Sequence, residues 1–163
     1  GVTAMIRIGN EKGKKDFFNL RRLAISNFLL IFLLDFFFCL VFLLAHDFLP
    51  WMYFDSSDSV ISENIIEVIT LAADLILIAA FFQIADGVQA VVLATLRGMQ
   101  DVWLPAFLIF LAYGAIGFPI SYHLALNTDW QIIGIWIGLL TGLTVSALFL
   151  IARFHYITKK LIT

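Results

Sequence analysis

The chain has 163 residues, of which 62% are apolar and 13% are charged, and its formal net charge at pH 7 is −2. A soluble domain carries about 25% charged residues, so this chain has too few to cover a surface that faces water. The composition therefore excludes an ordinary soluble enzyme, a disordered chain and a nucleic-acid-binding protein with a basic face. The single cysteine, Cys39, excludes an intrachain disulfide and a multi-thiolate metal site. The class that remains is a protein embedded in a lipid bilayer.

The first 23 residues precede the first long apolar run. Residues 1–9 are apolar at their start, and we expect them to be the end of a preceding helix. Residues 10–23 are expected to form a cytoplasmic loop, with a flexible charged connector over Gly9–Gly13 and an amphipathic lead-in that begins at the N-cap residue Asp16. Because the sequence starts at Gly1 without a methionine, we expect part of a longer membrane protein, with a complete small protein as the alternative.

Four apolar runs are each long enough to cross a bilayer as a helix. A hydrocarbon core about 30 Å thick requires about 20 apolar residues in helical form. The runs cover residues 24–45, 68–96, 104–126 and 132–152, and residues 153–163 follow them as a tail. The alternation of apolar and polar residues that is typical of a membrane β-barrel strand does not occur in them. The sequence therefore predicts an all-α integral membrane protein with four transmembrane helices.

All ten Lys and Arg residues fall on one side of this four-span arrangement. Six of them precede the first span, Arg97 lies between the second and third, and three follow the fourth. The other two connectors, residues 46–67 and 127–131, contain none. Positively charged loops stay on the cytoplasmic side, so both chain ends are predicted to be cytoplasmic, in the inner (plasma) membrane of a cell.

The second span contains a polar group near its middle. Asp86 lies 11 residues before Arg97, which is about 16 Å along a helix. Gln83 and Gln89 lie three residues to either side of Asp86 and share its helix face. A charged carboxylate at this depth in the membrane is energetically unfavourable, which indicates that it has a function. Its amide neighbours suit the binding of Na⁺ or the exchange of a proton. The alternative is a protonated Asp86 that only bonds a neighbouring helix.

Two further acidic residues lie inside the apolar runs. Asp35 is near the middle of the first span, among leucines and phenylalanines. We expect it to be protonated or to pair with a helix outside this chain, and the sequence leaves both a structural and a functional role open. Asp74 lies 12 residues before Asp86 and nearer the outer end of its span, where it is expected to be a vestibule or interfacial residue.

Small residues recur every four positions along the fourth span. Gly134, Gly138 and Gly142 form this line, and Ser146 continues it. Such a ridge allows a second helix to approach closely, so the pattern predicts a helix contact. In the third span, Pro119 removes one backbone hydrogen bond and is expected to bend the helix.

The sequence contains no arrangement of residues that indicates catalysis. No histidine stands at metal-ligand spacing from Cys39 or from a carboxylate, and neither a phosphate-binding loop nor a nucleophile elbow occurs. We therefore expect a protein that is not an enzyme and has no cofactor, and the predicted ion is Na⁺ or H⁺ at Asp86.

Several strings taken together resemble the multidrug and toxic compound extrusion (MATE) family, and its NorM-like members most. Phe82–Gln89 (FQIADGVQ), Leu96–Asp101 (LRGMQD) and Pro105 resemble the tenth helix of that family and the loop after it. Gly134–Leu139 (GIWIGL) resembles the start of its twelfth helix, and Ile6–Asn10 with Gly13 is similar to the end of its eighth. The four strings occur in the family's order.

This resemblance implies a fold of twelve helices in two six-helix lobes, which expels cationic lipophilic compounds in exchange for Na⁺ or H⁺. The four spans would be helices nine to twelve, part of the C-terminal lobe. Asp86 would occupy the acidic position of the tenth helix that binds the coupling cation, whereas no family role transfers to Asp35. The partner acidic residue on the seventh helix would lie before Gly1, and the N-terminal lobe and preceding helices would be partners of this chain.

Two other functions remain open from the sequence. One is a lipid-linked oligosaccharide flippase of the same superfamily, and the other is a four-helix membrane adaptor or small exporter that acts as an oligomer. The coupling ion and the transported compounds also remain open.

Overall fold

The computed structural model describes residues 1–53 and 63–162, and their regular structure is helical. The elements in chain order are α1 (Val2–Gly13), α2 (Phe17–Ala45), the short 3₁₀-helix η1 (Pro50–Tyr53), α3 (Glu63–Gly98), α4 (Trp103–Leu111), the π-helical segment η2 (Ala112–Gly117), α5 (Phe118–Asn127) and α6 (Gln131–Ile162). Within the described ranges no strand is present. The predicted all-α class is confirmed.

Four helical stretches are long and apolar enough to cross a membrane. They are Phe17–Ala45, Ile65–Gly98, Trp103–Asn127 and Gln131–Leu161. Each of the four predicted apolar runs lies inside one of these stretches. The chain is therefore an integral membrane protein by the length and composition of its helices.

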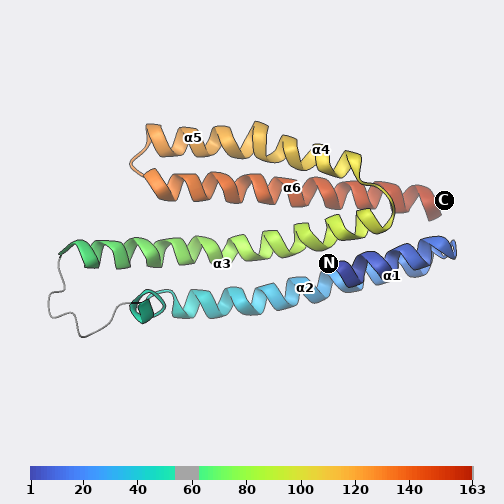
Figure 1. The fold of residues 1–163 in the computed structure, drawn as a ribbon, viewed down its shortest axis with the longest axis horizontal. Helices are drawn as coiled ribbons and strands as arrows, with labels where there is room; N and C mark the ends of the chain where they lie inside the picture. Colours follow the sequence, from blue (N-terminus) through green and yellow to red (C-terminus); the bar gives the residue numbers. More distant parts are fainter. Residues whose placement is uncertain (54–62, 163) are drawn as a thin grey trace.

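The long helices run back and forth, so that alternate connections lie at opposite ends of the molecule (Figure 1). The α1–α2 turn, the α3–α4 loop and the end of α6 lie together at one end, and the α5–α6 connection lies at the other. All ten basic residues belong to α1, the turn after it, the first turns of α2, the end of α3 and the later turns of α6. The structure thus gathers the basic residues at one end, and the cytoplasmic location of that end stays a prediction.

The flexible connector expected at Gly9–Gly13 is wrong, because α1 continues as a helix to Gly13. Tertiary contacts hold these turns against the end of α3. A side-chain methyl group placed on Gly9 would lie 3.5 Å from the carbonyl oxygen of Gly98, and the Lys12 ammonium group donates a hydrogen bond to the carbonyl of Met99. The N-cap role of Asp16 is confirmed, since its carboxylate accepts the backbone N–H of Asn19 at 3.0 Å.

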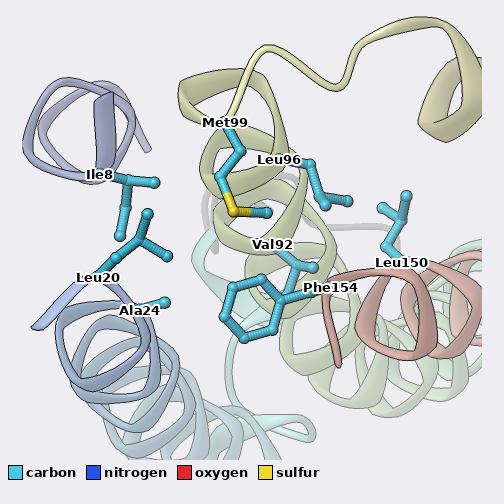
Figure 2. Close-up of a cluster of buried hydrophobic side chains, with 8 residues drawn as sticks. All are labelled: Ile8, Leu20, Ala24, Val92, Leu96, Met99, Leu150 and Phe154. Atoms are coloured by element: carbon cyan, nitrogen blue, oxygen red, sulfur yellow. The ribbon is translucent and has the colours of Figure 1, made fainter. Parts of the chain in front are cut away.

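A buried apolar cluster joins four helices at the basic end of the molecule. Figure 2 shows side chains from α1, α2, α3, the residue directly after α3 and α6, namely Ile8, Leu20, Ala24, Val92, Leu96, Met99, Leu150 and Phe154. In lipid such a cluster is held by close packing more than by exclusion of water. The cluster therefore fixes the position of α3, the helix that carries Asp86.

The third span is interrupted by a π turn directly before its proline. The segment η2 separates α4 from α5, and Pro119 is the second residue of α5. A proline ring clashes with the carbonyl group four residues earlier, here that of Ala115, and leaves it without a donor. The wider π turn takes up this disruption, as π segments inside helices commonly do.

Candidate functional site

Asp35 on α2 lies against Gly87 on α3. The Asp35 side chain is buried, at 5% exposure. A methyl group on Gly87 would overlap Oδ2 of Asp35, and it would lie 2.8 Å from Cγ of Asp35 and 3.1 Å from Cγ1 of Ile31. The missing side chain at Gly87 therefore provides the space that the Asp35 carboxylate occupies.

Two polar residues of α3 accompany this contact. The side chains of Gln83 and Asp86 both interact electrostatically with the Asp35 carboxyl group. Oδ2 of Asp35 has no hydrogen-bond partner. Asp86 itself is exposed on the surface of the chain. The sequence suggested that Asp35 is protonated or has its partner outside this chain, whereas the structure shows polar neighbours on α3.

The other amide of the predicted site faces the third span. The hydroxyl of Tyr113, in η2, donates a hydrogen bond to Oε1 of Gln89 at 3.3 Å. The charge of Asp86 also acts on the Tyr113 hydroxyl group. Gln83 and Gln89 thus lie toward different helices, with the exposed Asp86 between them along α3. We call the five residues Asp35, Gln83, Asp86, Gln89 and Tyr113 the Asp86 site.

The Asp86 site is acidic, and the spans that form it carry His123 but no permanently charged basic side chain. Residues 24–45, 68–96 and 104–126 contain no Lys or Arg. Two carboxyl groups in such surroundings repel each other when both are ionised, so one positive charge relieves the repulsion. Over the described residues, no group of three or more His, Cys, Asp and Glu side chains is arranged to hold a metal ion. The carboxyl groups at this site therefore favour a positive charge nearby.

Asp74 lies apart from this site. It is exposed on α3, 12 residues before Asp86, which corresponds to about 18 Å along the helix. No neighbour in the Asp86 site interacts with it in the described structure. Asp74 therefore serves as an acidic control position on the same helix.

Gly134, Gly138 and Gly142 of α6 lie against the η2–α5 segment that precedes α6 in the chain. A methyl group on Gly134 would lie 2.8 Å from the carbonyl carbon of Leu124, and one on Gly142 would lie 3.0 Å from Cα of Gly117. At Gly138 it would overlap the backbone of Ser121. The Ser121 hydroxyl also donates a hydrogen bond to the carbonyl of Ile135 at 3.1 Å. The structure thus places this line of small residues in the contact between α6 and the η2–α5 segment.

Sequence reasoning missed several residues that matter here. Tyr113, Gly117 and Ser121 carry no local signal that tells which helix they face. The ion pair between Arg153 of α6 and Asp101 of the α3–α4 loop joins residues 52 positions apart, with Nε and Oδ2 at 2.8 Å. The sequence shows the two charges, but no local pattern shows that they lie side by side.

Comparisons with known proteins show which family the chain belongs to. The MatE family profile matches residues 1–123. The chain belongs to the MATE family. The resemblance inferred from the sequence strings is thereby confirmed.

Curated relatives with the name "probable multidrug resistance protein NorM" match almost the whole chain. It is 33% identical over 156 residues to the protein of Xylella fastidiosa strain Temecula1, covering 96% of this chain and 31% of the relative. Identity to the Rhodopseudomonas palustris protein is 35% over 158 residues, covering 97% and 32%. The Bacillus thuringiensis subsp. konkukian protein is 34% identical over 158 residues, covering 97% and 33%. The MATE chain described here spans about a third of the length of these relatives.

A solved structure shares the fold. The crystal structure of the eukaryotic MATE transporter AtDTX14 superposes with a TM-score of 0.81 and covers 97% of this chain and 34% of its own. Sequence identity in that comparison is 20%, so the likeness concerns the fold. The helix arrangement in Figure 1 is therefore one that a MATE transporter contains.

Proposed function

We propose that this chain is part of a secondary-active multidrug efflux antiporter, which exports cationic lipophilic compounds in exchange for Na⁺ or H⁺. Membership of the MATE family and the names of the NorM relatives support this proposal. The transporter lies in the inner (plasma) membrane with both ends of this chain in the cytoplasm, because the basic residues share one end of the helices. The N-terminal lobe and the helices that precede this chain are its partners within the full-length transporter.

The observation that carries the proposal is the pair of carboxyl groups at the Asp86 site. Asp35 is buried, and Gln83 and the charge on Asp86 act on it, while the surrounding spans carry no Lys or Arg to compensate the two carboxylates. A bound cation or proton offsets the cost of these charges in the membrane. A ligand that binds one conformation more tightly shifts the population toward it. Occupation of Asp86 by the coupling ion therefore favours one orientation of the transporter.

Antiport results when the coupling ion and the cationic substrate cannot both bind the same conformation of the transporter. Asp86 is exposed on this chain, so it is open to an ion or to a cationic compound that enters between the two lobes. Transporter sites of this kind lie near the bilayer midplane between repeats. Release of the ion restores the negative charge of the site, and the negative site then attracts the substrate cation.

The test is the substitution Asp86→Asn in the full-length protein, followed by efflux of a cationic fluorescent dye from cells. The amide keeps the shape of the side chain but removes its negative charge, so we expect loss of dye efflux and of drug resistance at normal expression. Asp74→Asn is the matched control, since it removes an exposed carboxylate from the same helix. Wild-type efflux by the Asp86→Asn protein would overturn the proposal.

A further inference from the structure

The first turns of α2 carry two neighbouring arginines, Arg21 and Arg22. The helix has 29 residues, which is about 43 Å at 1.5 Å per residue, whereas a hydrocarbon core is about 30 Å thick. Residues 25–45 alone, at about 31 Å, are long enough to cross that core. The two arginines are therefore placed in the layer of the lipid headgroups, where charged side chains at the ends of transmembrane helices are stable.

The two arginines line a surface cavity of about 410 Å³. Phe18 and Ile25 line it as well, and the Phe18 side chain is 73% exposed. The cavity thus places two guanidinium groups beside exposed apolar side chains. This combination matches a ligand that is anionic at one end and apolar at the other.

A second cavity of about 390 Å³ adjoins the first, because Arg22 and Ser26 line both. It lies between α1 and α2, and its other lining residues include Glu11 and Asn19. Hydroxyl, amide and carboxylate groups are therefore available next to the guanidinium groups. They give this second cavity a polar lining that suits the hydroxyl groups of a lipid headgroup.

The acidic residues near the arginines have other partners. The Glu11 carboxylate pairs with Lys14 at 2.8 Å, and Asp16 accepts hydrogen bonds from the backbone and the side-chain amide of Asn19. Among the residues that the structure describes, neither Arg21 nor Arg22 forms an ion pair. Their positive charges are thus available to an anion in the headgroup layer.

We propose that Arg21 and Arg22 bind the phosphodiester group of an anionic phospholipid. Guanidinium groups donate paired hydrogen bonds to phosphate oxygens, and basic residues at a membrane surface attract anionic lipids. The acyl chains of the lipid leave the first cavity at Ile25 and continue along Leu29 and Leu33, which are exposed on the following turns of α2. The second cavity receives the rest of the headgroup.

This site does not depend on the antiport proposal, and it is tested by native mass spectrometry of the full-length protein in an uncharged detergent. The protein is titrated with phosphatidylglycerol or with phosphatidylcholine that has the same acyl chains. We expect the wild-type protein to bind phosphatidylglycerol more tightly than phosphatidylcholine. The double variant Arg21→Gln with Arg22→Gln should bind phosphatidylglycerol about tenfold more weakly or worse, and its affinity for phosphatidylcholine should change little.

The matched control is Lys15→Gln with Lys160→Gln. It removes two exposed positive charges from the same end of the molecule, outside both cavities, and should keep the preference for phosphatidylglycerol. If the double arginine variant does not fold, Arg22→Gln decides alone, with an expected loss of about fivefold.

Inorganic phosphate distinguishes a lipid site from a site for free anions. Millimolar phosphate should not displace phosphatidylglycerol, because it lacks the acyl chains that contact the apolar side of the first cavity. Displacement by phosphate would overturn the assignment to a lipid. Equal affinity of the wild-type protein and the arginine variant for phosphatidylglycerol, or an equal loss in the lysine control, would overturn the site itself.

Discussion

Arg153 near the end of α6 pairs with Asp101 in the loop between α3 and α4, with 2.8 Å between Nε of the arginine and Oδ2 of the carboxylate. Both side chains are largely buried, at 25% and 18% exposure. The pair ties the loop that follows the Asp86 helix to the last helix of the chain. It lies at the same end of the molecule as the apolar cluster in Figure 2.

We predict that Arg153→Ala lowers the stability of the full-length protein by roughly 1–3 kcal/mol, because a shielded carboxylate loses its charged hydrogen-bond partner. Thermal melting in detergent would measure the loss. Lys160→Ala is the matched control, since Lys160 is exposed on the same helix. The exchanged pair Asp101→Arg with Arg153→Asp should recover part of the stability, and a melting temperature unchanged in Arg153→Ala would contradict the role of the pair.

Gly138→Leu should reduce the amount of folded protein, because its side chain would occupy the position of the Ser121 backbone on α5. Overpacking of a close contact costs about 1–3 kcal/mol or more. Size-exclusion chromatography of the detergent-solubilised protein gives the folded fraction. Thr144→Leu places the same side chain on an exposed position of α6 and should be tolerated, so equal yields of the two variants would count against the packing role.

Gly87→Ala should destabilise the contact between α2 and α3 by about 1–3 kcal/mol, because the added methyl group overlaps the Asp35 carboxylate. Asp35→Ala removes the atoms that clash, so the double variant should lose less stability than the sum of the two single losses. A double-mutant cycle of melting temperatures tests this non-additivity. Strictly additive losses would show that Gly87 and Asp35 do not depend on each other.

The spans were predictable because each depends on a local property of the sequence. Long apolar runs define the four helices, and the positions of Lys and Arg define which helix ends lie together. Helix periodicity alone puts Gln83, Asp86 and Gln89 near one another on α3, but it does not show that Gln89 bonds Tyr113 of the third span. These features need no knowledge of which helix lies next to which.

What the sequence left open concerns contacts between helices. Periodicity shows that Asp35 interrupts an apolar helix, but it does not show that Gly87 of another helix lies opposite. The same holds for Gly138, whose small size is visible in the sequence while its neighbour Ser121 is not. The connector at Gly9–Gly13 was misjudged because glycines and charges indicate a loop locally, whereas packing against Gly98 and Met99 keeps it helical.

The orientation in the membrane is testable by labelling of single cysteines. On a Cys39→Ala background, Asp129→Cys places a thiol in the exposed connection between α5 and α6, and Lys160→Cys places one near the end of α6. A membrane-impermeant maleimide applied to whole cells should label Asp129→Cys, and it should label Lys160→Cys only after permeabilisation. The reverse pattern would contradict the cytoplasmic position of the basic end.

The most direct measurement of the central proposal is ion flux driven by substrate in proteoliposomes that contain the full-length protein. A gradient of a cationic substrate should drive Na⁺ or H⁺ in the opposite direction through the wild-type protein and through Asp74→Asn. The account predicts that Asp86→Asn abolishes this exchange although the protein remains folded. Ion exchange by Asp86→Asn at the wild-type rate would contradict the assignment of Asp86 as the cation-binding residue.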